Sequence, residues 1–203
     1  PSQHEFLASL AASPDIPWDS VVAFHMDEYI GLPKDAPQGF GNFLREHLFD
    51  LVEPGTVYYL DGQAADPAAE CRRYASLLEE HHVDVVCAGI GENGHLAFND
   101  PPTADFSDPR LVKVVELEDA CRRQQVHDGC FEALNDVPNH ALTLTIPALM
   151  AAEQIHTVVP GPTKTEAVGR TLGGAIGTEC PATALRKHSQ SVLYLDRESA
   201  ASV

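Results

Sequence analysis

The sequence predicts an α/β protein of the three-layer, Rossmann-like class, with a mostly parallel sheet that carries helices on both faces. The first observation behind this prediction is that short apolar runs rich in β-branched residues alternate with helical patterns along all 203 residues, as they do in βαβ units. The second is that several runs end in glycine, proline or acidic residues, and an open parallel sheet builds its binding site at such strand ends.

The individual elements follow from hydrophobic periodicity. Strands are expected over residues 20–25, 57–60, 83–88, 111–117, 141–146, 155–159 and 191–196. Helices are expected over residues 2–12 and 42–49, from Pro67 onward, within 121–128, and over 147–152, 165–172 and 180–185. Asp66 is the expected N-cap of the third helix, because its carboxylate can accept the free amides of the first turn and Pro67 has no amide to leave unsatisfied there.

The composition excludes several classes of partner. The chain has 30 acidic and 13 basic residues, a net charge of -17 and a pI of about 4.8, so its surface repels the phosphates of nucleic acids and anionic lipids. No apolar stretch is long enough to span a bilayer. The five cysteines are odd in number and widely spaced, which is typical of reduced thiols in a cytoplasmic protein. The ten histidines show no metal-binding spacing. We therefore expect no nucleic acid, membrane or metal partner.

One stretch, residues 83–100, has the strongest functional signal. It carries three glycines behind a predicted strand, Gly89, Gly91 and Gly94, which match the spacing of a dinucleotide-binding loop. That loop needs a long helix after its last glycine, whereas Asn-Asp-Pro-Pro at 99–102 ends any helix at once. His95 is also an unusual neighbour for a pyrophosphate. The pattern favours glycines that let the backbone approach a ligand, beside a histidine with an acidic neighbour, Asp100.

Two further strand ends carry polar side chains. Asp27 follows the strand over 20–25, where it is either a ligand-binding carboxylate or one of two solvated acids in a loop. Lys164 follows Pro-Gly-Pro-Thr at the start of a helix, where it is either part of an anion site or an exposed lysine. If a doubly wound sheet brings these residues to the edge that carries His95 and Asp100, the set suits acid–base chemistry on a small phosphorylated compound.

These residues resemble the glucosamine-6-phosphate deaminase family. The likeness is carried by Phe-x-Met-Asp-Glu-Tyr-x-Gly-Leu at 24–32, by Gly-Ile-Gly-x-x-Gly-His-x-Ala-Phe-Asn at 89–99 and by Gly-x-x-Lys at 161–164, in family order along nearly the whole chain. The resemblance implies a modified Rossmann-like α/β fold and a reaction that turns glucosamine 6-phosphate and water into fructose 6-phosphate and ammonium. It also implies a small phosphorylated sugar as the partner and no cofactor.

The resemblance implies a role for each matching residue. Asp27 matches the base that moves a proton between C2 and C1 of the opened sugar. His95 matches the histidine that helps to open the pyranose ring, and Lys164 matches a phosphate ligand. Gly89 and Gly91 would let backbone amides approach the sugar.

Two departures from the family pattern concern the support of His95. The family usually has aspartate where this chain has Asn93 and glutamate where it has Asp100. An asparagine can orient the ring but holds neither a charge nor a proton. Asp100 is one methylene shorter than glutamate, and its reach to His95 depends on the backbone. We expect Asp100 to be the acidic partner that remains, with Glu92 as the alternative.

Other family features have no clean match in the sequence. A family arginine that binds phosphate has three candidates here, Arg122, Arg123 and His127. The family's first strand and its glycine/threonine phosphate loop would precede Pro1. Residues 1–203 are therefore expected to form a single deaminase-like domain that lacks this segment of the working protein. The sequence leaves the oligomeric state open, including a homo-oligomer.

Two alternative functions are consistent with parts of the sequence. A 6-phosphogluconolactonase shares the Gly-x-Gly-x-x-Gly-His pattern and hydrolyses a lactone, although Met-Asp-Glu-Tyr at 26–29 and Ala-Phe-Asn at 97–99 favour the deaminase. A sugar-phosphate sensor domain would need no catalysis, and Asn93 is compatible with weakened catalysis. The presence of both Asp27 and His95 argues against the sensor.

Overall fold

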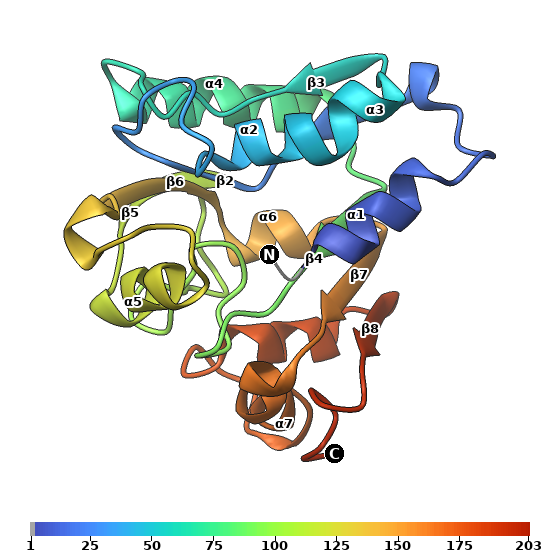
Figure 1. The fold of residues 1–203 in the computed structure, drawn as a ribbon, viewed down its shortest axis with the longest axis vertical. Helices are drawn as coiled ribbons and strands as arrows, with labels where there is room; N and C mark the ends of the chain where they lie inside the picture. The colour runs from blue at the N-terminus through green and yellow to red at the C-terminus, as the bar shows by residue number, and fades with distance from the viewer. Residues whose placement is uncertain (1–2) are drawn as a thin grey trace.

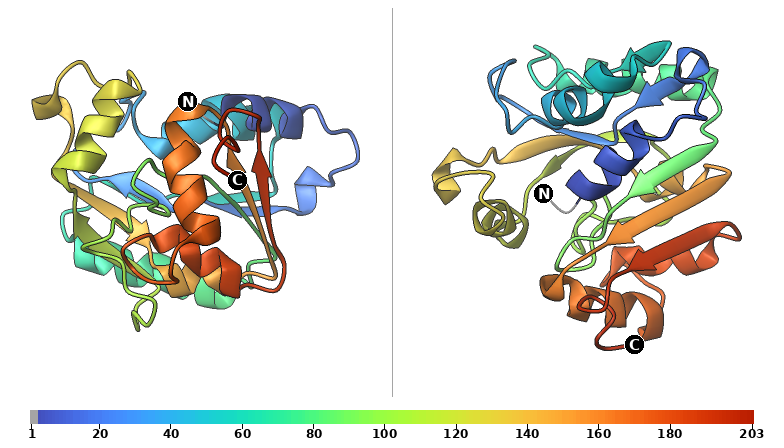
Figure 2. Two further views of the ribbon diagram at one scale, coloured as in Figure 1. Left: turned by 90° about the horizontal axis from the view of Figure 1, so that it is seen from below. Right: turned by 45° about the vertical axis from the view of Figure 1, so that its right-hand side comes forward.

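The computed structural model describes residues 3–203, and its parallel strands form two groups (Figure 1). β1 (Val22–Phe24) pairs with β3 (Thr56–Tyr58). β7 (Gln154–Val159) lies between β4 (Val85–Ala88) and β8 (Ser191–Leu195). Figure 2 shows β4, β7 and β8 running side by side in one direction. The mostly parallel α/β architecture predicted from the sequence is confirmed.

The structure also contains an antiparallel sheet, which corrects the prediction for residues 26–29. β2 (Asp27–Tyr29), β6 (His140–Leu144) and β5 (Val112–Glu116) pair in the order β2-β6-β5. The sequence predicts that residues 26–29 lie at the carboxyl end of the first strand, whereas they form a separate short strand in which Asp27 lies opposite Thr143.

The change of sheet takes place at His25, at the end of β1. Its amide donates to the hydroxyl of Tyr74 at 2.9 Å, and its carbonyl accepts from the same hydroxyl at 2.9 Å, so neither group bonds to a neighbouring strand. The next carbonyl, that of Met26, accepts the amide of Leu144 at 2.8 Å. A side chain therefore satisfies the backbone where the chain leaves one sheet and enters the other.

The helices largely agree with the predicted ranges. They are α1 (His4–Ala11), α2 (Phe40–Leu44) with the π-helical turn Arg45–Phe49 and α3 (Asp50–Val52), α4 (Pro67–Glu80), α5 (Asp119–His127), α6 (Ile146–Met150) and α7 (Thr165–Gly173), with a 3₁₀ helix over Pro181–Lys187. The predicted N-cap is confirmed, because Asp66 accepts the amides of Ala68 and Ala69 at 3.0 and 3.1 Å. Within the described residues, no helix is long and apolar enough to cross a membrane.

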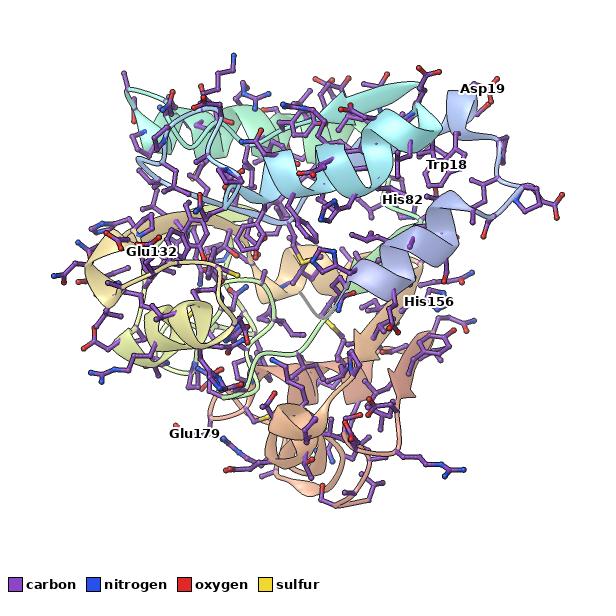
Figure 3. The ribbon with its side chains drawn as sticks, viewed as in Figure 1. Trp18, Asp19, His82, Glu132, His156 and Glu179 are labelled. Carbon is purple, nitrogen blue, oxygen red and sulfur yellow. The ribbon has the colours of Figure 1, made fainter. Side chains whose placement is uncertain are left out.

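The largest hydrophobic core lies between α4, α6, the 3₁₀ helix and the inner faces of the two sheets, and includes Tyr74, Leu142 and Ile155. The outer face of β4, β7 and β8 is more open to solvent. There, His156, which is labelled in Figure 3, stacks on Tyr194 with their ring centroids 5.9 Å apart. Val85 and Val192 are exposed on the same strands.

Candidate active site

The loop after β4 folds tightly around one glycine. The amide of Gly91 donates to the carbonyl of His95 at 3.0 Å, and the amide of Gly94 donates to the carbonyl of Gly91 at 2.9 Å. A Cβ built on Gly91 would lie 2.1 to 2.3 Å from three atoms of the His95 ring. This corrects the expectation that the Gly91 amide faces the sugar, because that amide closes the loop. Gly91 instead leaves the space that the imidazole ring occupies.

The other glycines of the loop have different neighbours. Gly89 lies beside α1, where an added Cβ would be 3.1 Å from the side-chain nitrogen of Gln3. Gly94 has φ = 88°, a conformation that favours glycine, and an added Cβ would be 2.5 Å from the sulfur of Cys180. The carbonyl of Gly94 accepts the amide of Ala182 at 2.8 Å, which fixes the loop to the 3₁₀ helix.

A substitution of Gly91 by alanine should therefore displace the His95 ring. We expect Gly91→Ala to lower kcat by about 10²-fold, the size of effect that a misplacement of about 1 Å can have, while the fold is retained. The matched control is Gly173→Ala, because a Cβ at Gly173 meets no atom within 4 Å and should leave kcat unchanged. Unchanged turnover of Gly91→Ala in a steady-state assay would contradict this role.

The His95 ring is held on one side by two oxygen acceptors. Its Nδ1 lies 2.8 Å from Oδ1 of Asn93 and 3.1 Å from Oδ1 of Asp100. Asn93 also accepts the backbone amide of His95 at 3.0 Å, while its Nδ2 donates to Oδ1 of Asp100 at 2.7 Å. If the side-chain amide of Asn93 were flipped, its NH₂ group would face the backbone N–H of His95, and two donors would oppose each other. The hydrogen-bond network therefore fixes the orientation of Asn93. Since both neighbours of Nδ1 are acceptors, the proton belongs on Nδ1 and Nε2 keeps a free lone pair.

Asp100 reaches His95 despite its short side chain. It is 1% exposed, and it follows Ala97, whose φ of 49° bends the loop back toward the ring. Burial alone would raise the pKa of the Asp100 carboxyl. The hydrogen bonds from His95 and Asn93 hold that pKa below its usual value, and the charge of His95 adds to the effect when the ring is protonated. A buried carboxylate therefore stands behind the imidazole, and Glu92 is not needed in this position.

Asp27 is the partly buried first residue of β2. Burial raises the pKa of Asp27 to about 7, and the charge of the adjacent Glu28 adds to the effect. Successive residues of a strand point to opposite faces, and Glu28 is held there by backbone amides. Its Oε1 accepts from Tyr29 and Phe40 at 2.9 and 3.1 Å, and its Oε2 accepts from Gly41 at 2.9 Å. Glu28 therefore anchors the start of α2, which leaves Asp27 as the carboxyl available for proton transfer.

The strand β6, which pairs with the strand of Asp27, is bound directly to the His95 loop. The hydroxyl of Thr143, opposite Asp27 on β6, accepts the amide of Phe98 at 3.1 Å. The side chain of Asn99 donates to the carbonyl of Leu144 at 2.8 Å. Burial raises the pKa of the Cys121 thiol, and the charges of Asp100 and Asp27 add to that effect. The structure thus brings Asp27, His95 and Asp100 into one cluster.

Lys164 is buried at the end of a short 3₁₀ helix, Pro162–Lys164, which follows β7. Burial lowers the pKa of its ammonium, and the charges of Asp128 and Glu92 oppose that effect. Within the described part of the chain, its Nζ has no hydrogen-bond partner. A cavity of about 400 Å³ is lined by Asn93 and by Thr163, next to Lys164. A buried cation without a hydrogen-bonded partner, beside a cavity, can bind an anionic group.

The arginine candidates from the sequence lie outside this cluster. Arg122 donates to the carbonyls of Leu134 and Val137 at 2.8 and 3.1 Å, so it holds the segment after α5. Arg123 pairs with Asp119 at the surface. His127 is the candidate nearest the site, because its Nδ1 lies 3.7 Å from Oε1 of Glu92, in the same loop as Asn93.

Sequence reasoning missed two residues of the cluster. Cys121 is 1% exposed and lies beside Asp100, although its position in the sequence suggests only a buried thiol. Thr143 alternates with apolar residues in β6, and that pattern shows which face it shares but not that its hydroxyl binds the His95 loop. No spacing signal could have identified either contact, since each joins segments more than 20 residues apart.

Comparisons with known proteins show which family the chain resembles. A family model described as glucosamine-6-phosphate isomerases/6-phosphogluconolactonase matches residues 2–194. A glucosamine-6-phosphate deaminase from Exiguobacterium sibiricum is 37% identical over 180 residues, which cover 89% of this chain and 69% of that protein. A glucosamine-6-phosphate deaminase from Bacillus cereus is 38% identical over 179 residues, covering 88% of this chain and 66% of its own length. The chain thus spans about two thirds of these relatives.

Solved structures give the same result for the fold. A monomeric glucosamine-6-phosphate deaminase matches with a TM-score of 0.89 at 30% identity, covering 99% of this chain and 83% of that one. A 6-phosphogluconolactonase from Thermotoga maritima matches with a TM-score of 0.76 at 21% identity, covering 96% and 81%, and it shares the fold alone. The Rossmann-like class and the family resemblance predicted from the sequence are confirmed. This chain belongs to the family of glucosamine-6-phosphate isomerases and 6-phosphogluconolactonases.

Proposed function

We propose that this protein is a glucosamine-6-phosphate deaminase, which converts glucosamine 6-phosphate and water into fructose 6-phosphate and ammonium. The observation that carries the proposal is the partly buried carboxyl of Asp27, whose pKa is raised to about 7 by burial, in the same cluster as His95. A base with a pKa near the working pH is suited to removing a proton from carbon. The two deaminases that are 37% and 38% identical to this chain support the same reaction.

The first step is the opening of the pyranose ring by His95. The acceptors Asn93 and Asp100 keep the ring proton on Nδ1, so Nε2 is free to take the proton of the anomeric hydroxyl. As the ring C1–O5 bond breaks, a proton is returned to the ring oxygen. The Asp100 carboxylate stabilises the imidazolium that forms in between.

The second step is the transfer of a proton from C2 to C1 by Asp27. In its ionised form, the carboxylate takes the C2 proton of the open sugar while the aldehyde oxygen O1 takes a proton from solvent, which gives an enolamine. Return of the proton to C1 gives an iminium at C2, and water hydrolyses it to the ketone and ammonium. One carboxyl can serve both as base and as acid because its pKa of about 7 makes both forms accessible.

The remaining elements of the proposal concern binding and location. Lys164 binds the phosphate of the sugar, since its buried ammonium has no hydrogen-bond partner among the described residues and it follows Thr163, which lines the cavity together with Asn93. The free cysteines, which include buried Cys71 and exposed Cys87, support a cytoplasmic protein. No cofactor takes part in any step.

A direct comparison of two substrates tests the proposal against the lactonase alternative. Purified protein should release ammonia from glucosamine 6-phosphate with a kcat/KM well above that for acid release from 6-phosphogluconolactone. Lactone hydrolysis breaks the acyl C1–O5 bond by attack of water and involves no C2-to-C1 proton transfer, so it does not need a base at C2. Efficient lactone hydrolysis without ammonia release would refute the proposal, and binding without turnover of either substrate would indicate a sensor.

The pH dependence follows from the pKa of Asp27. The carboxyl is protonated and inactive as a base at low pH, and it becomes active as the pH rises through about 7. We therefore expect kcat/KM, which reports the free enzyme, to rise through that region. A profile of initial rates at several pH values checks this expectation. A profile that stays flat between about pH 5 and 9 would contradict a base with this pKa.

A further inference from the structure

A buried sulfur atom adjoins the His95–Asp100 pair. Cys121 lies in the first turn of α5 and is 1% exposed. Its Sγ, one ring nitrogen of His95 and one carboxylate oxygen of Asp100 all lie within 4.8 Å of one another. The thiol is within hydrogen-bonding reach of the carboxylate, and the nitrogen and oxygen are 3.1 Å apart. Sequence spacing gives no sign of this trio, because Cys121 is more than 20 residues from the loop.

The three donors fit a thiophilic divalent cation. Zinc is bound by thiolate sulfur, imidazole nitrogen and carboxylate oxygen at about 2.0 to 2.3 Å, so two ligands of a tetrahedral ion lie roughly 3.3 to 3.8 Å apart. The trio is therefore close to the required spacing. Thiolate and imidazole favour zinc or cobalt, whereas magnesium and calcium prefer oxygen ligands alone. The nearby carboxyl of Asp27 adds negative potential at the same place.

Two other groups of potential ligands among residues 3–203 are less suited to such an ion. One consists of His82, Asp84 and Glu153, which are all exposed. The other consists of Glu92, His127 and Asp128, of which the last two are exposed. Neither contains sulfur, and water competes for exposed carboxylates. The buried trio is the group in which a soft ligand and a dry environment coincide.

We propose that His95, Asp100 and Cys121 bind one cation of the zinc class, and that its binding switches the reaction centre off. The thiol loses its proton to solvent when sulfur binds the cation. Binding at Nδ1 displaces the proton of that nitrogen, so the neutral ring carries its proton on Nε2. An Nε2–H group cannot accept the proton of the anomeric hydroxyl. Removal of the cation by a chelator restores the Nδ1–H form, so the inhibition is reversible.

Only the inhibitory half of this inference rests on the proposed function, so binding is tested without the reaction. The metal-free full-length protein is titrated with Co²⁺ alone. We expect a thiolate-to-cobalt charge-transfer band in the near ultraviolet, which disappears when Zn²⁺ is added. Cys121→Ser should lose the band and bind Co²⁺ at least roughly 100-fold more weakly, more than the loss of an outer-shell partner costs. The matched controls Cys87→Ser, at an exposed cysteine, and Cys130→Ser should keep it.

A second measurement needs no variant. X-ray absorption at the zinc edge of the unaltered protein, loaded with one equivalent of Zn²⁺, should show one sulfur ligand together with nitrogen or oxygen ligands. Absence of a sulfur ligand in this spectrum would overturn the site. A cobalt band of equal strength in Cys121→Ser would also overturn it, provided that the circular dichroism spectrum of the variant matches that of the unaltered protein.

The inhibitory half is tested by turnover of glucosamine 6-phosphate. Zn²⁺ should lower kcat of the unaltered protein at least tenfold, with recovery on chelation, and Mg²⁺ at equal concentration should not. Cys121→Ser should lose this sensitivity relative to its own metal-free rate. Equal inhibition by Mg²⁺, or equal Zn²⁺ inhibition of Cys121→Ser, would overturn the switch. If the metal-free protein releases no ammonia while the cobalt band behaves as expected, the proposed function fails and the cation site stands.

Discussion

Replacement of Asp27 by asparagine should lower kcat for ammonia release by about 10³-fold, within the usual range for the loss of a general base. The amide has nearly the shape of the carboxyl, but it cannot accept the C2 proton. Because Lys164 and the cavity beside Asn93 are unchanged, binding of the sugar phosphate should remain within a few-fold of the unaltered protein. Initial rates give the first quantity and isothermal titration calorimetry gives the second. Comparable turnover in both proteins would exclude Asp27 as the base.

Asp27→Asn should also change how the stability of the protein depends on pH, and this gives a second, independent measurement on the same variant. The pKa of Asp27 is raised in the folded protein, mainly by burial, so between about pH 4 and 7 the folded state keeps a proton that the unfolded chain has lost. The contribution of this carboxyl to stability therefore falls as the pH rises through that window. Asp27→Asn cannot ionise and should unfold at a higher temperature than the unaltered protein at alkaline pH. Asp35→Asn, at an exposed acid, should change neither stability nor rate.

Replacement of His95 by glutamine should produce the second large effect, a loss of about 10²-fold or more in kcat with the closed-ring substrate. Glutamine is polar and of similar length, but it has no basic nitrogen to take the anomeric proton. An open-chain analogue of the substrate bypasses ring opening, so its conversion should be slowed much less. The measurement is the ratio of the two rates in His95→Gln and in the unaltered protein.

The ratio of the closed-ring rate to the open-chain rate shows whether His95 acts in ring opening or in another step. Equal slowing of the closed and open forms would mean that His95 acts in the proton transfer or in folding, and not in ring opening. Asn93→Ala is an informative companion, since it removes one acceptor at Nδ1 but leaves Asp100 at 3.1 Å. It should slow the closed-ring reaction less than His95→Gln does.

The fold class and the positions of three candidate site residues after apolar runs could be predicted from the sequence because they depend on local patterns. Apolar runs alternate with helical patterns, and Asp27, His95 and Lys164 each follow such a run. In a mostly parallel sheet, residues after strands gather at one side. Asp66 could also be predicted as an N-cap, since capping depends only on residues within one turn.

The remaining features depend on contacts between distant segments, which periodicity does not encode. The strand β2 exists because the hydroxyl of Tyr74 satisfies the backbone of His25, 49 residues away. A glycine is needed at position 91 because a side chain there would occupy the space of the His95 ring, whereas the sequence suggested that this glycine lets the backbone approach a ligand. Cys121 joins Asp100 from another helix. Each of these contacts requires the folded arrangement of the elements.

Product analysis of glucosamine 6-phosphate turnover tests the central claim most directly. Magnetic resonance spectra recorded during incubation with the full-length protein should show fructose 6-phosphate and ammonium appearing in equal amounts. Asp27→Asn, folded by circular dichroism, should form neither at a comparable rate. If the unaltered protein binds glucosamine 6-phosphate and forms no fructose 6-phosphate, or if Asp27→Asn forms both products as fast, the account of this site is wrong.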